Sequence, residues 1–197
     1  RAVDLFFVAA SVLIAVPTGV KQFNWSGTMV AGRVRFTTPM LFCVAALLQF
    51  LIGGLAGVSH AVAPLDWQTK NSYYLVAHFH NIFVGLIVFA ILGAIYYWFP
   101  KMSGRMMSER IGKWTFWLMV IGFNLTFMIQ HVLGLAGMPR RTFTYPDLPG
   151  WTWMNMVSTI GAFFMAPASI LFVWDLVASV LRGKRAGDNP WSAWTLE

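Results

Sequence analysis

The sequence has 197 residues, of which 58% are hydrophobic and 11% are charged, and its formal net charge is +7. Soluble domains usually carry about 25% charged residues, so this composition argues against a soluble globular protein. The single cysteine, Cys43, excludes a disulfide framework and a cysteine-based metal or iron–sulfur site, and we expect its side chain to be buried. The positive charge is explained by the loops, as described below, and no nucleic-acid partner is expected.

Five apolar segments follow one another along the chain. Four stretches contain no Asp, Glu, Lys or Arg, and each exceeds the roughly 20 residues that a helix needs to cross a bilayer: residues 36–65, 71–100, 114–139 and 148–174. The composition predicts an all-α integral membrane protein, a bundle of five transmembrane helices at 1–183 with a cytoplasmic tail at 184–197. The predicted spans are about 5–24, 37–61, 72–99, 112–136 and 152–181.

Basic residues are divided unevenly between the two sets of connections. If the helices alternate in direction, ten Lys and Arg residues fall on one side and four on the other. The positive-inside rule makes the richer side cytoplasmic. Arg140 and Arg141 lie on the outer side, where a cationic pair needs a local anionic partner. The chain starts at Arg1 without a cleavable signal peptide, so we expect a piece of a longer polypeptide.

The segment at residues 72–81, SYYLVAHFHN, places His78 and His80 in an uncharged membrane helix. A separation of two residues along an α-helix corresponds to a rotation of about 200° and a rise of about 3 Å. The rings of His78 and His80 therefore point to nearly opposite faces of the helix. They cannot share one small metal ion on an intact helix, but they can hold two separate cofactors. Imidazole is a common axial ligand of haem iron, which makes two haems the natural candidates. Hydrogen bonding to neighbouring helices is the alternative, and it is favoured for the isolated His60 and His131.

A cation is predicted inside the first span. Lys21 follows Pro17, which loosens the helical hydrogen-bond ladder and frees a carbonyl that water or Thr18 can use. An ammonium group within a bilayer is costly unless it meets water or a partner. Snorkelling of Lys21 to the cytoplasmic interface is the alternative interpretation.

Three motifs in order resemble subunit I, the largest subunit, of the A-type haem–copper terminal oxidases. Residues 73–80, YYLVAHFH, resemble that family's histidine signature. Residues 17–21, PTGVK, resemble its proton-channel lysine segment, and residues 134–141, GLAGMPRR, its haem-propionate arginine loop. The tail at 188–197 is also similar to bacterial members. The resemblance covers nearly the whole chain but only the C-terminal half of that subunit, which has a larger, twelve-helix-type architecture.

The resemblance implies a role for each ligand candidate. His78 would be the proximal ligand of the oxygen-reducing haem, and His80 one of two axial ligands of the low-spin, electron-donating haem. Both haems would be of A type. Arg140 and Arg141 would bind haem propionates, since guanidinium groups hold carboxylates bidentately. Asp66 and Tyr145 would belong to the same polar cap, whereas Thr18 and Lys21 would line a path for proton uptake.

The sequence departs from the family pattern in its metal sites. The implied copper ion has three histidine ligands, and none of those motifs occurs here, so the copper ligands and the second axial histidine must lie outside this chain. A His-Asp pair that helps to bind Mg²⁺ or Mn²⁺ is replaced by Lys70 and Asn71. Because lysine offers no lone pair at neutral pH, we expect that metal to be missing or reorganised.

The implied function is the reduction of O2 to water with electrons from cytochrome c, coupled to proton translocation across a bacterial cytoplasmic membrane. The partners would include an electron-accepting subunit II. Quinol is the alternative donor, because Asn71 and Asn81 are reminiscent of the quinol-oxidising branch, whereas Pro139 is more similar to cytochrome c oxidases. A haem-free, proton-relaying transporter subunit and a structural scaffold subunit are rival interpretations from other classes.

Overall fold

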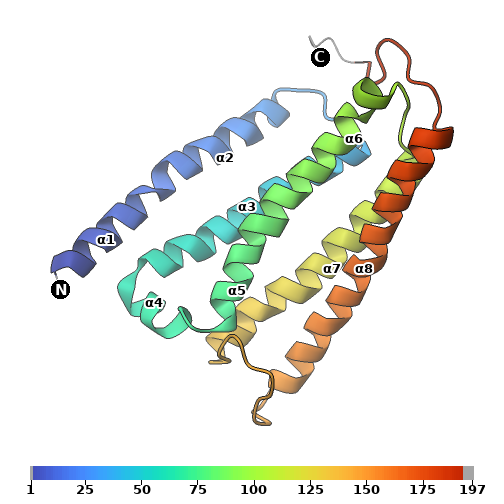
Figure 1. Cartoon of the computed structure of the whole chain (residues 1–197). Coiled ribbons are helices and arrows are strands. Elements are labelled where there is room, and N and C mark those ends of the chain that lie inside the picture. The colour runs from blue at the N-terminus through green and yellow to red at the C-terminus, as the bar shows by residue number, and fades with distance from the viewer. Residues whose placement is uncertain (1, 193–197) are drawn as a thin grey trace.

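The computed structural model describes residues 2–192, with only the backbone of Ala2, and within that range the chain is helical apart from its connections and two isolated bridges. Figure 1 shows long helices packed side by side. In chain order the elements are α1 (Ala2–Leu13), α2 (Ala15–Val30), α3 (Thr38–Ala61), α4 (Ala63–Thr69), α5 (Tyr73–His80), the π-helix η1 (Asn81–Val88), α6 (Phe89–Ser103), α7 (Glu109–Leu135) and α8 (Trp151–Arg182).

Five helical rods in the described range are long and apolar enough to cross a bilayer: Val3–Val30, Thr38–Ala61, Tyr73–Ser103, Glu109–Leu135 and Trp151–Arg182. The expected fold class, an all-α membrane protein with five transmembrane helices, is therefore confirmed. The first rod continues to Val30, beyond the predicted boundary near residue 24. It is interrupted at Ile14, between α1 and α2, because Pro17 cannot donate a backbone hydrogen bond to the preceding turn.

The core lies between α3, the α5–η1–α6 rod, α7 and α8. Its centre is aromatic, with Phe42, Phe89 and Phe123 fully buried and in ring contact. Helices α7 and α8 approach each other closely at Gly122 and Gly161, where an added Cβ on Gly161 would lie 2.6 Å from the Gly122 carbonyl oxygen. Small residues at such crossings let membrane helices pack by backbone contact, which is the main attraction available in lipid.

The α1–α2 rod packs against the rest of the bundle along one side only. No side chain of α2 is buried, and its contacts with α3 include the Trp25–Phe50 ring pair and a 3.2 Å hydrogen bond from Gln22 Nε2 to the Leu47 carbonyl. Its apolar surface is consequently available to lipid or to other parts of a larger protein. Cys43, expected to be buried, is instead exposed on α3.

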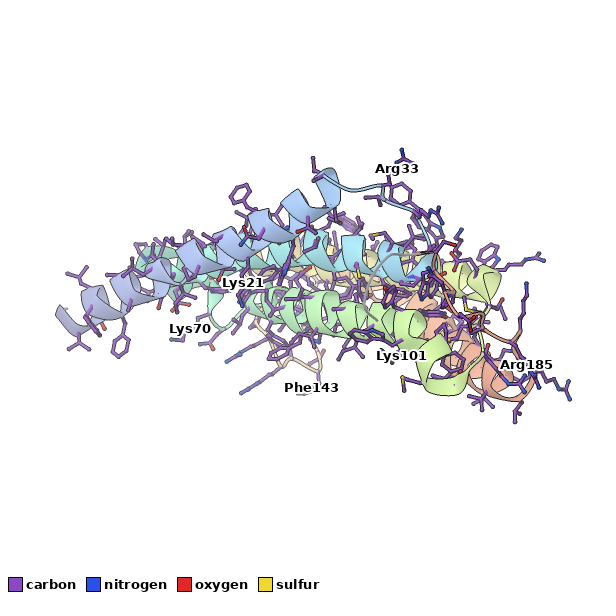
Figure 2. All side chains as sticks on the ribbon, turned by 90° about the horizontal axis from the view of Figure 1, so that it is seen from above. Lys21, Arg33, Lys70, Lys101, Phe143 and Arg185 are labelled. Carbon is purple, nitrogen blue, oxygen red and sulfur yellow. The ribbon has the colours of Figure 1, made fainter. Side chains whose placement is uncertain are left out.

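Connections gather at the two ends of the bundle (Figure 1). Arg33 and Arg185 lie toward one end and Lys70 toward the other (Figure 2). At the first end, the segment after α6 is joined to the segment after α8 by Met106 N–H to the Lys184 carbonyl, 2.8 Å, and by Arg105 Nη1 to the Gly183 carbonyl, 2.8 Å. Arg1 and the tail positions 193–197 lie outside the described residues.

Candidate functional site

The two candidate haem ligands face different neighbours. His78 is directed toward α3, where its ring lies against Gly53 and Gly57. His80 is directed toward α7, where its ring stacks on Phe127 with centroids 4.1 Å apart and an interplanar angle of 16°. The two rings lie about 200° apart around the helix axis, as helix geometry requires. They therefore contact two different helices.

A hydrogen bond between helices orients His78. Its Nδ1 lies 2.9 Å from the carbonyl oxygen of Gly53. Because a carbonyl can only accept, Nδ1 carries the proton and donates it, which leaves Nε2 with its lone pair. Histidines that bind metals usually donate their other ring N–H to a carbonyl or carboxylate in this way. Among the described residues Nε2 has no hydrogen-bond partner, so this atom is free to ligate an iron.

Gly57 makes room for the His78 ring. A Cβ on Gly57 would lie only 2.9 Å from the ring's Cε1 atom, closer than real Cβ contacts. The glycine therefore fixes how near the ring stands to α3. Gly53, which supplies the carbonyl, sits one helical turn away, so both glycines act on the same ring.

His80 is held by local contacts instead. Its Nδ1 lies 2.8 Å from the Val76 carbonyl one turn earlier, and Phe127 covers one face of the ring. An i−4 bond of this kind is also made by His131, to Phe127 at 3.1 Å, so by itself it does not distinguish a ligand. The Nε2 atoms differ: within the described part of the chain, that of His131 is buried and has no hydrogen-bond partner, whereas that of His80 is not enclosed in this way. The stacking leaves the Nε2 edge of His80 open.

The helix that carries the two candidate ligands is fixed at its start. Ser72 is the N-cap of α5, and its hydroxyl accepts the Tyr74 amide at 3.2 Å, which satisfies one of the unpaired donors of the first turn. The Tyr74 hydroxyl lies 2.9 Å from Ser59 Oγ on α3. The Tyr74 ring stands between those of His60 and His131, at centroid distances of 5.2 and 5.1 Å. These contacts set the depth and rotation of the histidine helix.

The arginine loop is attached directly to this helix start. Backbone hydrogen bonds run from Tyr73 N to the Met138 carbonyl, 3.0 Å, and from Arg140 N to the Asn71 carbonyl, 2.9 Å. The guanidinium of Arg140 also donates to Asn71 Oδ1 at 3.3 Å. Arg141 is exposed and adopts a left-handed conformation with φ of 65°. Residues 69 positions apart in the sequence are thus brought to one end of the bundle.

Asp66 lies on the short helix α4 at the same end. Its Oδ1 is 3.4 Å from His60 Nδ1, and its Oδ2 is 3.6 Å from Lys70 Nζ. His60 in turn lies against the His78 ring, with centroids 5.3 Å apart. The structure shows no contact between Asp66 and either arginine. Tyr145, the other expected member of the polar cap, packs against Trp151 instead.

The residues at the expected Mg²⁺ or Mn²⁺ position do not suit a divalent cation. Lys70 is a cation paired with Asp66, and the side-chain oxygen of Asn71 already accepts a hydrogen bond from Arg140. Lys70 therefore places a positive charge at the position where a metal cation would have to bind. The Asn71 oxygen that could ligate the cation is already hydrogen-bonded to the positively charged Arg140. These residues therefore do not fit a divalent metal ion.

Lys21 and Thr18 are not part of the histidine site. Both lie on α2, and Lys21 stands nine residues before the helix end at Val30, a distance of about 13 Å. The Thr18 hydroxyl donates to the Ile14 carbonyl at 2.9 Å, next to the break that Pro17 imposes. Among the described residues Lys21 has no ion pair or hydrogen bond, and its side chain is exposed on the rod.

A comparison with protein families decides the relationship. A family model described as "Cytochrome C and Quinol oxidase polypeptide I" matches residues 1–164. The chain belongs to the cytochrome c and quinol oxidase subunit I family. Members of this haem–copper oxidase family among curated proteins are similar over nearly the whole chain. The cytochrome c oxidase subunit 1 of Bacillus sp. strain PS3 is 51% identical over 188 residues, which is 95% of this chain and 30% of that protein.

Other curated subunit I proteins are similar to this chain to the same degree. A probable cytochrome c oxidase subunit 1-beta of Nocardia farcinica is 50% identical over 95% of this chain and 32% of its own length. The quinol oxidase subunit 1 of Bacillus subtilis is 47% identical over 95% of this chain and 29% of its own. The chain therefore spans about a third of the length of these relatives. A solved haem–copper terminal oxidase dimer has the same fold over 75% of this chain and 27% of its own, with a TM-score of 0.66 and 23% identity.

Sequence reasoning missed the groups that orient the subunit I histidines. Gly53, Gly57 and Phe127 belong to other helices, so no pattern around residues 73–80 points to them. One signal was available: the run at 53–57 places small residues four positions apart in an apolar helix, a spacing typical of close helix contacts. Asn71 was considered only as a metal ligand, whereas the structure uses it to hold Arg140.

Proposed function

We propose that this chain forms part of a respiratory terminal oxidase, in which it binds two haems through His78 and His80. The complete enzyme reduces O2 to water with electrons from cytochrome c and couples the reaction to proton translocation. The observation that carries the proposal is the hydrogen bond from His78 Nδ1 to Gly53, because it leaves Nε2 with its lone pair as the ring's metal-binding atom. The family relationship supplies the chemical context.

The haems, once bound, supply the electron transfer and oxygen chemistry. The chain's own residues place and orient them. Because His78 and His80 lie on one helix, which is capped by Ser72 and braced by Tyr74, the two ligand atoms are held in a fixed relation. His78 would hold the oxygen-reducing haem and His80 the electron-donating haem, the roles that the family resemblance implies for them.

Arg140 and Arg141 anchor the carboxylate groups of the haems at the end opposite the basic loops. Asn71 and the backbone pairing with Met138 hold this loop against the start of the histidine helix. Copper ligands and the second axial histidine come from residues outside this chain. Other oxidase subunits, including subunit II, and a bacterial cytoplasmic membrane complete the proposed assembly, with the basic end in the cytoplasm.

Lys21 and Thr18 contribute proton uptake. The resemblance of residues 17–21 to the family's proton-channel lysine segment supports this role over snorkelling of the ammonium group to the interface. The break near Pro17 and the Thr18 hydroxyl provide polar groups to which water can bind along the same helix.

Visible spectroscopy tests the proposal. The purified complex that contains this chain should show haem bands that change on reduction, and exchange of His78 and of His80 should remove different bands. An unchanged spectrum in both variants would refute the ligand assignment. A complex without haem bands would favour the proton-relaying transporter instead.

Oxygen consumption with reduced cytochrome c and with quinol separates the two donors, and activity only with quinol would assign the chain to that branch.

A further inference from the structure

A small cavity lies at the basic end of the bundle, between the last turns of α6 and the segment after α8. Its volume is about 260 Å³. Trp191 closes one wall: its ring stacks on that of Tyr97, with centroids 5.6 Å apart and an interplanar angle of 11°, and its Nε1 donates to the Tyr97 carbonyl at 2.9 Å. The segment at 186–191, which returns to the end of α6 (Figure 1), therefore forms a fixed side of the cavity.

Two opposite charges line this cavity without pairing. Lys101 on α6 and Asp188 in the returning segment are both exposed, and within the described part of the chain neither side chain has an ion pair or a hydrogen bond. Trp98 is 48% exposed on the α6 wall, and its indole N–H has no acceptor among the same residues. The cavity therefore offers a ligand one cation, one anion and one neutral hydrogen-bond donor.

The depth of the cavity is that of lipid headgroups. The spanning rod Tyr73–Ser103 has Val88 at its centre. With this centre at the bilayer midplane and a rise of 1.5 Å per residue, Trp98 lies about 15 Å and Lys101 about 20 Å from the midplane. The hydrocarbon core ends at about 15 Å, and the headgroup layer at about 20–22 Å. Trp98 therefore lies at the edge of the hydrocarbon, where indole rings concentrate, and Lys101 lies among the headgroups.

We propose that this cavity binds the headgroup of phosphatidylethanolamine. The phosphate pairs with Lys101 and accepts the Trp98 N–H, while the ammonium group donates to the carboxylate of Asp188. Ile91 precedes Trp98 by two turns on the same helix face and is also exposed, so it offers apolar surface to the acyl chains. The volume lies below the roughly 300–1,000 Å³ of drug-sized ligand pockets and suits a small headgroup.

The charge pattern selects this headgroup over other common ones. An anionic lipid such as phosphatidylglycerol could pair with Lys101 but would leave Asp188 facing negative charge. Phosphatidylcholine carries both charges, but its quaternary ammonium group has no N–H to donate to a carboxylate. A primary ammonium group beside a phosphate satisfies both walls of the cavity.

Native mass spectrometry of the purified, delipidated complex tests the proposal, with phosphatidylethanolamine and phosphatidylglycerol of identical acyl chains as probes. The native complex should bind phosphatidylethanolamine more tightly. Lys101→Gln should weaken the binding of both lipids roughly five-fold, the loss expected for one surface ion pair. Asp188→Asn should weaken only the binding of phosphatidylethanolamine, by a similar factor, and so remove the preference. Comparison with the native complex separates this cavity from other lipid sites.

Two matched variants and a soluble probe complete the experiment. Lys101→Arg keeps the charge and should keep native binding. Lys184→Gln removes an exposed charge that does not line the cavity and should also bind as the native complex does. Glycerophosphoethanolamine carries the same headgroup without acyl chains, and at a concentration equal to that of the lipid it should not displace it.

Four results would overturn the proposal: equal affinity of the native complex for the two lipids, native binding in Lys101→Gln, an equal loss in Lys184→Gln, or displacement by an equal concentration of glycerophosphoethanolamine. The last result would assign the cavity to a soluble molecule. The experiment does not depend on the haem assignment, because the lipid can bind as expected even if His78 and His80 prove not to be ligands.

Discussion

His78 and Gly53 are joined by a 2.9 Å contact between the ring Nδ1 and the main-chain carbonyl oxygen, across two helices. Because the acceptor belongs to the backbone, no substitution at position 53 removes it without moving the helix. The ring is therefore held by the packing of α3 against α5. The glycines of α3 permit this packing, which makes them part of the proposed ligand site.

Substitution of His78 and of His80 by alanine should affect oxygen consumption and the haem spectrum in different ways. His78→Ala should reduce oxygen consumption to background while the low-spin haem bands remain, because only the oxygen-reducing haem loses its ligand. His80→Ala should remove the low-spin bands. His131→Ala is the control, since that ring makes a similar local hydrogen bond but is not proposed as a ligand. Reduced-minus-oxidised spectra of the purified complex measure all three variants, and loss of both haems in His131→Ala would contradict the assignment.

Gly57→Ala should disturb the His78 ring. The added methyl group would stand 2.9 Å from Cε1, so the ring or α3 must shift. We expect a changed spectrum of the haem bound by His78, with the low-spin haem unaffected. Gly54→Ala is a matched control, because nothing lies within 4 Å of its Cβ position. It should leave the spectrum unchanged and stabilise the helix by up to about 1 kcal/mol. Equal spectra for the two variants would show that Gly57 does not position the ring.

Arg140→Gln should lower the midpoint potential of the haem whose carboxylates Arg140 is proposed to hold. Removal of a nearby positive charge favours the oxidised, more positive state, by on the order of 1 kcal/mol or roughly 40 mV for one electron. Spectroelectrochemical titration measures this shift. Arg185→Gln removes the same charge from an exposed position at the other end and should leave the potential unchanged. An equal shift in both variants would indicate a general charge effect rather than local anchoring.

Lys21→Met should slow steady oxygen reduction about 100-fold or more, because a positioned proton-transfer group typically contributes at least that factor. Haem content should remain normal, since Lys21 lies on α2, whereas the described contacts of His78 and His80 are with α3, α5 and α7. Lys184→Met changes an exposed lysine at the basic end and serves as the control. Proton uptake during turnover in reconstituted vesicles provides the measurement. Native turnover in Lys21→Met would leave snorkelling as the better explanation of this lysine.

The membrane fold could be predicted from the sequence because its cause is local. A charge-free run long enough to span hydrocarbon must satisfy its backbone hydrogen bonds within one helix, so composition alone determines the elements. The same holds for the directions of His78 and His80, which follow from 3.6 residues per turn. The π-helix at Asn81–Val88 had no such signal.

Tertiary structure decided the relations between helices. Nothing in the local sequence indicates that Gly53 faces His78, that Asn71 holds Arg140 or that Tyr96 meets Asp175, since each pair is separated by 25 to 79 positions. Such contacts depend on how side chains of several helices pack at once. The chain's chemistry by itself therefore determined which side chains could bind an iron or a proton, and the packing of the bundle determined which nitrogen, carbonyl or hydroxyl each of them meets.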